Sequence, residues 1–358
     1  MKVLSLGLDN SILDKNSSLA KRVVEYGDLV DKYTVIVPSG NGEKIILSEK
    51  VKAYGASQGN KIFKFFKICK LARKILKEEK YNLITVQDQY FLGLLGYRLA
   101  KKFKIGLEIQ IHGFEKYSGL RKIIAKFIIP KANSIRTVSQ RMKKKLVNEF
   151  KVAEEKVTVV PIYTKVKGQM LNVTRLPARQ ESQKDKFIFL TVGRLVEIKN
   201  ISMQIKAIIE TAKENVELWI VGDGEERKKL EAEAKGNESI KFLGWQNNLE
   251  KFYEQADAFL LTSNYEGWGI VVVEAAAYGL PIIMTDVGCA GELIKNGESG
   301  IIIPVVDQKE LEKEMIRLVD DTELREKLGR GAKQAIKKLP TKEETLKLYK
   351  KSWEKAVK

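Results

Sequence analysis

The sequence predicts an α/β protein built from two doubly wound, Rossmann-like domains. Three observations support this prediction. Short apolar runs alternate with segments of helical character along the whole chain, which is the pattern of parallel β-α units. The chain has 358 residues, 44% of them hydrophobic, and is long for one hydrophobic core. A polar stretch without a sustained period, residues 163–185, separates two series of these units.

The predicted strands fall into two series along the chain. The first comprises the runs VLSLGL, YTVIVP, LITVQ, KIGLEIQI, SIRTVS and VTVVPI, and the second comprises FIFLTVG, VELWIVG, SIKFLG, DAFLLTS, LPIIMTD and GIIIPV. We therefore expect an N-terminal domain over residues 1–165, a linker over 166–185 and a C-terminal domain over 186–338. In open parallel sheets ligands bind at the carboxyl ends of the strands, so a cleft between the two domains is the expected site.

Cysteine content and the start of the chain indicate the compartment. Cys69 and Cys289 are the two cysteines and stand far apart, which argues for a reducing cytoplasm and against a disulfide or zinc framework. The start, MKVLSLGLDN, lacks the apolar core and small-residue site of a signal peptide. No apolar run approaches the roughly 18 residues that suggest a spanning helix. We expect a cytoplasmic protein, either soluble or peripheral to a membrane.

The net charge of +18 is confined to the first half of the chain. Residues 1–165 contain 33 Lys plus Arg against 15 Asp plus Glu, whereas the remainder contains 31 of each kind. Such asymmetry is typical of proteins with a polyanionic partner, either nucleic acid or an acidic membrane surface. General lysine enrichment is the alternative, but it does not explain the neutral second half.

Residues 61–80, KIFKFFKICKLARKILKEEK, carry eight Lys or Arg and two Glu among apolar side chains. An apolar face edged with cations is how a helix lies on an anionic membrane. Lys61, Lys64, Lys67 and Lys70 are the candidate membrane or acceptor surface. The alternative is a helix packed on its own sheet with a solvated basic rim. The runs GLRKIIAKFIIPK and QRMKKKL repeat the pattern and favour the membrane-facing interpretation.

Two cations follow the first strand of the second domain. The strand ends at Gly193, and Arg194 and Lys199 come before the next helix. Arg194 offers a bidentate fork and Lys199 a point charge, which together suit a diphosphate. Surface charge in a lysine-rich protein is the alternative. The later run WIVGDGEERKKL contains Gly222, which with Gly224 permits a tight strand-to-helix turn and is weak as a nucleotide signal.

A glutamate in an apolar helix marks the other half of the expected site. In the stretch TSNYEGWGIVVVEAAAYG, Glu274 lies among valines and alanines, where an unpaired carboxylate is costly. The glycines around Trp268 let a ligand approach the first amides of a helix that begins near Ile270. A carboxylate that accepts hydrogen bonds from vicinal hydroxyls is a familiar way to hold a ribose. We therefore expect a nucleotide to be the partner of Glu274.

These motifs resemble the retaining glycosyltransferases of family 4, which have the GT-B fold. The matching residues cover the second domain: Gly193, Arg194 and Lys199; Gly222 and Gly224; Glu266 and Glu274; Gly288, Glu292, Gly297 and Gly300. The resemblance implies that Glu266 approaches the transferred sugar, that Glu274 binds ribose, and that Arg194 and Lys199 hold the diphosphate. It also implies that the amides of the following donor-loop residues contact sugar and phosphate: Gly267, Trp268, Gly269, Ile270 and Val271.

The resemblance extends to three further places. The segment FLGWQ resembles the strand end that meets the base, which would place Gly244 and Trp245 there. The final segment, 339–358, is expected to form a helix that returns to the N-terminal domain, with Trp353 on its apolar stripe. His112 is the only histidine, and a lone histidine is usually structural or merely exposed. In the family, however, a His-Gly pair after this strand commonly faces the donor sugar.

One segment departs from the family pattern. The first strand and its loop, LGLDNSILDKNSSLAKRV, lack the usual Gly-Gly loop near the donor phosphates. Asn16, Ser17 and Ser18 are placed to cap the first helix instead. The contacts of this loop with donor or acceptor are therefore left open.

The predicted function is transfer of a sugar from a UDP- or GDP-linked donor to a hydroxyl of a lipid-linked or cell-envelope glycan, at the inner face of the cell membrane. No Asp-x-Asp element is present, so we expect no metal and no cofactor, with cations and helix amides stabilising the leaving diphosphate. Retention is implied by the resemblance alone, and Glu266 as a covalent nucleophile is the alternative to a phosphate oxygen acting as base.

Two rival classes of protein remain open. A sugar-nucleotide epimerase has a similar architecture but needs acid and base groups in its cleft, and a single histidine counts against it. A nucleic-acid-binding protein would also use the basic first half, yet no helix-turn-helix, zinc-ligand or aromatic RNA-binding signature is present, so we expect no nucleic-acid partner.

Overall fold

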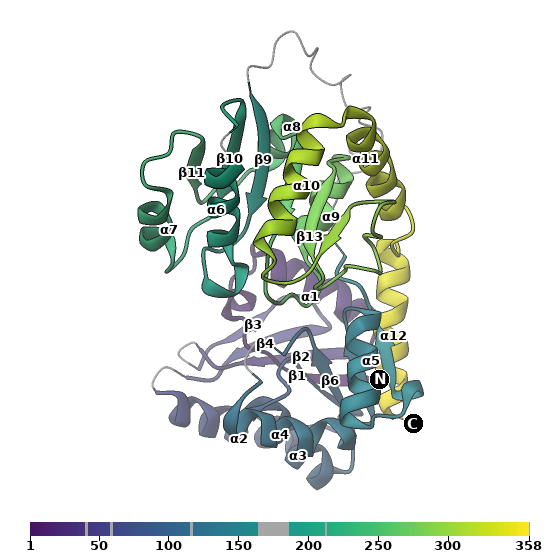
Figure 1. The fold of residues 1–358 in the computed structure, drawn as a ribbon. Coiled ribbons are helices and arrows are strands. Elements are labelled where there is room, and N and C mark those ends of the chain that lie inside the picture. Colours follow the sequence, from purple (N-terminus) through teal and green to yellow (C-terminus); the bar gives the residue numbers. More distant parts are fainter. Residues whose placement is uncertain (40–41, 58–59, 115–116, 164–185, 212, 358) are drawn as a thin grey trace. The chain divides into compact units, whose positions relative to one another are not determined.

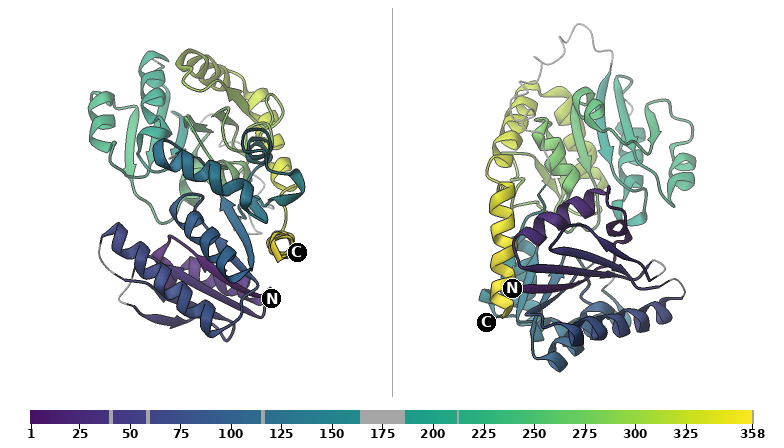
Figure 2. Two further views of the ribbon diagram at one scale, coloured as in Figure 1. Left: turned by 90° about the horizontal axis from the view of Figure 1, so that it is seen from below. Right: turned by 180° about the vertical axis from the view of Figure 1, so that it is seen from behind.

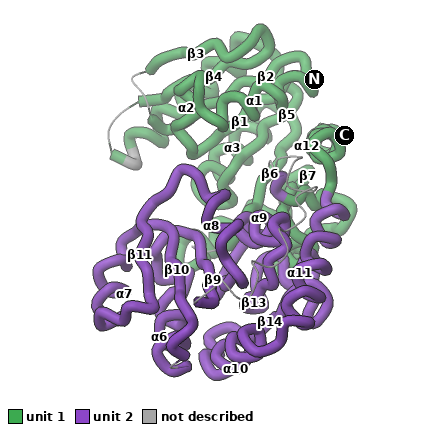
Figure 3. The backbone as a smooth tube through the Cα atoms, turned by 90° about the horizontal axis from the view of Figure 1, so that it is seen from above, with its two compact units in different colours: residues 1–161, 340–358 green, residues 162–339 purple. Residues whose placement is uncertain are grey.

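In the computed structural model, two compact units make up the chain (Figure 3). Unit 1 comprises Met1–Pro161 with Pro340–Lys358, and unit 2 comprises Ile162–Leu339. The structure describes residues 1–39, 42–57, 60–114, 117–163, 186–211 and 213–357. The expected linker over 166–185 lies outside the described residues. The C-terminal segment folds with unit 1, although unit 2 precedes it in the chain.

Unit 1 is an α/β unit around one sheet (Figures 1 and 2). Its strands are β1 (Lys2–Leu6), β2 (Lys32–Val37), β3 (Lys44–Ile46), β4 (Val51–Gly55), β5 (Leu83–Val86), β6 (Gly106–Ile111), β7 (Ser134–Thr137) and β8 (Val157–Val159). Its helices are α1 (Ser18–Asp28), α2 (Lys61–Glu78), α3 (Phe91–Phe103), α4 (Gly119–Ile128), α5 (Gln140–Phe150) and α12 (Lys342–Val357), with 3-10 turns η1 (Asn10–Leu13), η2 (Ile129–Lys131) and η3 (Glu154–Lys156).

Within the described residues, the sheet of unit 1 has the order β3-β4-β2-β1-β5-β6-β7-β8. β3 is antiparallel to β4, and the other neighbours pair in parallel. Helices α2, α3 and α4 lie side by side against one face of the sheet, and α1 lies on the opposite face, where Tyr26 stacks on Tyr349 of α12. Ser17 caps α1 by accepting from the Ala20 amide at 3.0 Å, as the sequence predicts.

Each of the six predicted runs of unit 1 contains a strand, but the sequence prediction missed β3 and β4. Strand β4 alternates buried residues with half-buried ones, and β3 at the sheet edge is largely exposed. Neither strand is therefore a continuous apolar run. A search for such runs finds central strands with both faces covered and passes over short strands at the edge.

Helix α12 docks on unit 1 through a buried polar cluster. Glu108 of β6 is fully buried and accepts from Thr85 Oγ1 and Ser352 Oγ at 2.5 Å each and from Trp353 Nε1 at 3.0 Å. The buried Arg136 Nε lies 3.5 Å from the same carboxylate, and its guanidinium lies 3.6 Å from the centre of the Tyr349 ring. The C-terminal helix therefore supplies partners that satisfy a charge inside unit 1.

Unit 2 has the same kind of architecture. Its strands are β9 (Phe187–Val192), β10 (Val216–Val221), β11 (Ile240–Gly244), β12 (Ala258–Leu261), β13 (Ile282–Thr285) and β14 (Ile301–Ile303). Its helices are α6 (Ile201–Thr211), α7 (Arg227–Ala234), α8 (Glu250–Gln255), α9 (Ile270–Ala277), α10 (Gln308–Asp320) and α11 (Thr322–Ile336), with the 3-10 turn η5 (Glu197–Lys199).

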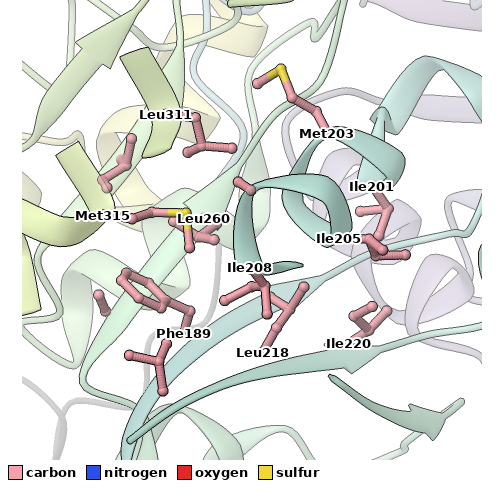
Figure 4. Close-up of a cluster of buried hydrophobic side chains, with 14 of the residues drawn as sticks. Phe189, Ile201, Met203, Ile205, Ile208, Leu218, Ile220, Leu260, Leu311 and Met315 are labelled. Carbon is pink, nitrogen blue, oxygen red and sulfur yellow. The ribbon is translucent and has the colours of Figure 1, made fainter. Parts of the chain in front are cut away.

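The strands of unit 2 are all parallel, in the order β11-β10-β9-β12-β13-β14. Helices α6, α7 and α10 cover one face, and α8, α9 and α11 cover the other. Figure 4 shows the core between the sheet and the first of these layers, where Phe189, Leu218 and Leu260 of three strands meet Ile208 of α6 and Met315 of α10. Each predicted run of unit 2 contains a strand, and the predicted two-domain α/β fold class is confirmed.

We expect Glu108→Ala to lower the free energy of unfolding of unit 1 by about 3 to 5 kcal/mol, because it leaves Arg136 buried without a carboxylate. Urea unfolding followed by circular dichroism measures the loss, and hydrogen exchange of residues 342–357 should accelerate. The exposed carboxylate of Glu78, 3.8 Å from Lys74, provides the control. Glu78→Ala should cost about 0.5 kcal/mol or less. Equal losses in the two variants would contradict a structural role for the cluster.

Candidate active site

The predicted site residues of unit 2 lie at one edge of its sheet. Because the strands are parallel, their carboxyl ends meet there. Strands β9, β10 and β11 are neighbours in the sheet, and hydrogen bonds join their carboxyl ends. The Gly193 amide donates to Val221 O at 3.0 Å, and the Gly222 amide donates to Gly244 O at 2.8 Å. Beyond Gly244, the side chain of Trp245 is 68% exposed. These contacts bring the predicted residues Gly193, Gly222 and Gly244 side by side.

Two of the glycines are required by the close approach of two loops. Gly222 has φ = 140°, and a Cβ there would lie 1.8 Å from Gly193 O. A Cβ on Gly224 would lie 2.3 Å from Leu195 O. No other residue fits at either position without moving the backbone. A Cβ on Gly193 would meet nothing within 4 Å, so the same loop has open space on its other side.

Lys199 and Glu266, two of the predicted catalytic residues, are in direct contact. Lys199 ends η5, after β9, and Glu266 lies in the loop between β12 and α9. The ammonium of Lys199 donates to Glu266 Oε1, and the Ser263 hydroxyl donates to the same oxygen at 2.8 Å. The two charged side chains are 21% and 11% exposed, respectively. An ammonium has three donors, so Lys199 can hold Glu266 and a further anion at once.

The side chain of Arg194 differs from that of Lys199 in its surroundings. Its side chain is exposed just beyond β9, and it makes no hydrogen bond or ion pair with the residues that the structure describes. The site therefore contains one cation paired with a carboxylate and one cation free to bind an anion bidentately.

The N-terminus of α9 presents free amides at the same edge. Gly269 precedes the helix with φ = 96°, and the amides of residues 267–271 donate to no other described residue. Trp268 is buried, and its carbonyl accepts from the Cys289 amide at 2.9 Å. Gly288 permits this contact, because a Cβ there would lie 2.5 Å from Trp268 O. Unpaired amides at the start of a helix form a binding site for phosphate or carboxylate.

Glu274 lies in the second turn of α9 and is half-buried. Its Oε2 accepts from the Tyr253 hydroxyl of α8 at 2.8 Å. Burial raises the pKa of the Glu274 carboxyl, and the hydrogen bond from Tyr253 lowers it, with a net increase above the ordinary value of 4.5. The sequence predicts a nucleotide as the partner of this carboxylate, and the structure supplies Tyr253 as a partner from within the chain.

Sequence reasoning missed several residues that hold the predicted ones. Tyr253 lies 21 residues before Glu274 in another helix, so no local pattern connects them. Ser263 could have been found, because a small polar residue two positions after a buried strand and three residues before Glu266 is within reach of that carboxylate.

The remaining predicted residues belong to unit 1. His112 follows β6 with an exposed side chain, and the carbonyl of the adjacent Gly113 accepts from Gln89 Nε2 at 2.6 Å. The predicted contact of His112 with a sugar stays a prediction. Lys67 and Lys70 are exposed on α2, Lys64 is half-buried, and the side chain of Lys61 lies outside the described residues. Among the part of the chain that is described, no group of three or more His, Cys, Asp or Glu is arranged to hold a metal ion.

Comparison with known proteins identifies the family. The sequence profile described as "Glycosyl transferases group 1" matches residues 172–335, and that of "Glycosyltransferase Family 4" matches residues 20–162. The chain belongs to glycosyltransferase family 4. It is 28% identical to the lipopolysaccharide core biosynthesis glycosyltransferase LpsE of Rhizobium meliloti, over 47% of this chain and 49% of that protein. The match thus spans about half the length of this curated relative.

Other glycosyltransferases show likeness over longer stretches. The UDP-Gal:alpha-D-GlcNAc-diphosphoundecaprenol alpha-1,3-galactosyltransferase of Escherichia coli is 27% identical over 69% of each chain. The crystal structure of Anabaena HepE in complex with UDP-glucose superposes with a TM-score of 0.74, at 18% identity, covering 99% of this chain and 98% of HepE. At this identity the likeness concerns the fold, which is GT-B, as the resemblance implies.

We expect Glu274→Gln to raise the thermal unfolding midpoint at pH 7. The ionised Glu274 carboxylate is less stable in its folded surroundings than in the unfolded chain, and glutamine carries no charge. A carboxyl whose pKa is raised on folding destabilises the protein above that pKa and has no effect below the unfolded value. The gain should therefore shrink as the pH falls towards 4.5. Calorimetry of the two proteins from pH 7 downwards measures it.

Tyr253→Phe tests the cause of the pKa. It removes the hydrogen bond that favours the charged form, so it should move the titration of Glu274 to higher pH. Tyr278→Phe is the matched control, because the Tyr278 ring stacks on Tyr253 at 5.2 Å and leaves the Tyr253–Glu274 bond intact. A pH-independent effect of Glu274→Gln would show that the carboxyl does not titrate as described.

Proposed function

We propose that the protein transfers a sugar from a nucleoside diphosphate sugar to a hydroxyl of an envelope glycan or lipid-linked acceptor. The observation that carries this proposal is the convergence of Arg194, Lys199 and the free amides after Glu266 at one sheet edge. Two cations and a helix N-terminus suit the negative charge of a diphosphate. Membership in glycosyltransferase family 4 and the UDP-glucose in HepE support a nucleotide-sugar donor.

In the proposed reaction, the bond between the anomeric carbon and the diphosphate oxygen breaks as the acceptor hydroxyl attacks that carbon. Arg194, Lys199 and the amides of residues 267–271 stabilise the negative charge on the departing diphosphate, so no metal is needed. The hydroxyl proton passes to a phosphate oxygen, and attack on the face from which the diphosphate leaves retains the configuration.

The contacts of Glu266 support an electrostatic role over a nucleophilic one. Its Oε1 already accepts from Lys199 and Ser263, which lowers the nucleophilicity of that carboxylate. For Glu274 we propose that the oxygen not bonded to Tyr253 accepts from a ribose hydroxyl. A half-buried carboxylate held by one neighbour retains acceptor capacity for this bond.

The identity of the acceptor rests on relatives and on the charge of unit 1. One relative is named for an undecaprenol-linked substrate and another for lipopolysaccharide core biosynthesis. These names support a lipid-linked or envelope glycan acceptor. Thermal shift with a panel of UDP- and GDP-sugars tests the donor, followed by mass spectrometry of the products. Nucleoside diphosphate released together with a glycosylated lipid is the expected result, whereas an isomerised donor would show an epimerase.

We expect Arg194→Ala to lower turnover by about two orders of magnitude, because a free cation at the leaving group acts mainly in the transition state. The release of nucleoside diphosphate measures the rate. Arg330→Ala is the control, because Arg330 is exposed on α11 and is already paired with Glu326 at 3.1 Å. Wild-type activity should survive exhaustive chelation. A loss that magnesium or manganese restores would overturn the metal-independent mechanism.

We also propose that unit 1 docks on an anionic membrane through the layer formed by α2, α3 and α4. Helix α2 exposes Phe63 and Phe66, and α4 exposes Leu120, Ile123 and Phe127, with α3 packed between the two helices. Cations lie next to two of these side chains: Lys67 Nζ lies 4.9 Å from the Phe63 ring centre, and Lys131 Nζ lies 3.8 Å from that of Phe127. Exposed apolar groups among cations favour an anionic lipid surface. No helix of the described chain is long and apolar enough to span a membrane.

We expect joint replacement of Lys61, Lys64, Lys67 and Lys70 by Gln to reduce co-sedimentation with anionic vesicles, since each cation near the surface contributes on the order of 1 kcal/mol. Binding of the wild type should fall as salt rises. A control with the same charge change replaces exposed lysines of unit 2 by Gln: Lys228, Lys235, Lys309 and Lys327. Equal pelleting of all proteins with anionic and neutral vesicles would show that the positive charge has another purpose.

A further inference from the structure

A chain of buried hydrogen bonds lies beneath the Lys199–Glu266 pair. It begins at Gln204, in the first turn of α6, whose side chain is fully buried. Gln204 Nε2 donates to Thr262 Oγ1 at 2.8 Å and to Thr191 Oγ1 at 3.3 Å. Gln204 therefore cannot touch a ligand at the surface, and any effect on the site must pass through these hydroxyls.

The Thr262 hydroxyl links Gln204 to the turn that carries Lys199. A hydroxyl has one proton, and since Thr262 Oγ1 accepts from Gln204, its own proton points away from the amide. It donates to Asn200 O at 2.9 Å, with Lys199 O at 3.3 Å. Asn200 has φ = 48°, a left-handed conformation that non-glycine residues adopt with local support. The Thr262 hydroxyl thus anchors a turn of unusual backbone geometry.

The same turn is tied to the Glu266 loop by further bonds. The Asn264 amide donates to Ile198 O at 2.8 Å, and Asn200 Nδ2 donates to Asn264 Oδ1 at 3.3 Å. Residues 262–264 lie between β12 and Glu266, so the turn with Lys199 and the loop with Glu266 are held in register. Gln204 is the buried end of this connection.

Stability alone does not account for a glutamine at this position. Gln204 Oε1 is buried and has no hydrogen-bond partner among the described residues. Leaving a buried polar atom unpaired is unfavourable, and an apolar side chain of similar size would avoid that loss. The amide therefore contributes through its hydrogen bonds, and the shorter of the two, to Thr262, leads on to the turn that carries Lys199.

We propose that Gln204 and Thr262 are positioning residues that hold the backbone of Lys199 so that its ammonium meets Glu266 and the incoming diphosphate. The last part of this statement rests on the proposed function. The pairing of Lys199 with Glu266 does not.

The first test measures the reactivity of Lys199 without any nucleotide. Reductive methylation followed by peptide mass spectrometry gives the modification rate of each lysine. Gln204→Leu and Thr262→Val remove the hydrogen bonds and should each raise the rate at Lys199 several-fold, because the ammonium spends less time paired with Glu266. Thr262→Ser keeps the hydroxyl and should restore the wild-type rate. Thr191→Val removes only the hydrogen bond between Gln204 and Thr191 and should leave the modification rate of Lys199 at the wild-type value.

The second test uses UDP and GDP as probes in calorimetric titrations. Gln204→Leu and Thr262→Val should weaken binding of the nucleotide that the wild type prefers by about tenfold, the effect of losing one well-placed hydrogen bond. Gln204→Leu should add nothing in a protein that already carries Lys199→Ala, since both changes act through the same ammonium. The unfolding midpoint of Gln204→Leu should equal or exceed that of the wild type.

The outcomes separate this proposal from the proposed function. Wild-type reactivity of Lys199 in both Gln204→Leu and Thr262→Val would overturn the positioning role, whatever the nucleotide results. Additive effects of Gln204→Leu and Lys199→Ala would also overturn it. If the wild type binds neither UDP nor GDP, the donor assignment fails, while the methylation rates still decide whether Gln204 positions Lys199.

Discussion

The contact between Lys199 and Glu266 joins two loops on which the arrangement of the whole site depends. A partly buried charge that loses its partner is strongly unfavourable, so each of these residues fixes the place of the other. The loop after β9 thereby brings Arg194 to the same edge, and the loop after β12 leads into the free amides of α9. This one contact, together with the parallel sheet beneath it, places the cations that follow β9 next to the carboxylate that follows β12.

Most of the fold of unit 2 and part of its site are predictable from sequence, because they follow from local patterns. Buried parallel strands are continuous apolar runs, and the residues after each run lie at one edge. The start of α9 at Ile270 follows from the glycines before it. What the sequence could not supply are contacts between elements that no pattern connects. Tyr253 reaches Glu274 from α8, and Gln204 reaches Lys199 from α6 through Thr262.

The same limit applies to unit 1. The run from residue 61 to residue 80 predicts an amphipathic helix, but its pattern does not tell which apolar side chains enter the core. In the structure Ile68, Ile75 and Leu76 are buried, whereas Phe63 and Phe66 are exposed. Helix α2 therefore combines the two alternatives, because one part of its apolar surface packs into the core and another part is exposed. The division is set by the packing of α2 against β2 and α3, which is a tertiary property.

Helix α12 has a consequence for how the protein is made. Its Trp353 lies in the core of unit 1, yet it is translated after all of unit 2. During synthesis the first unit therefore emerges from the ribosome with Glu108 and Arg136 present but with Ser352 and Trp353 missing. Domains generally fold as units in the order of their synthesis. Here the second unit has all of its strands before the first has helix α12, so completion of the first unit waits until α12 has been synthesised.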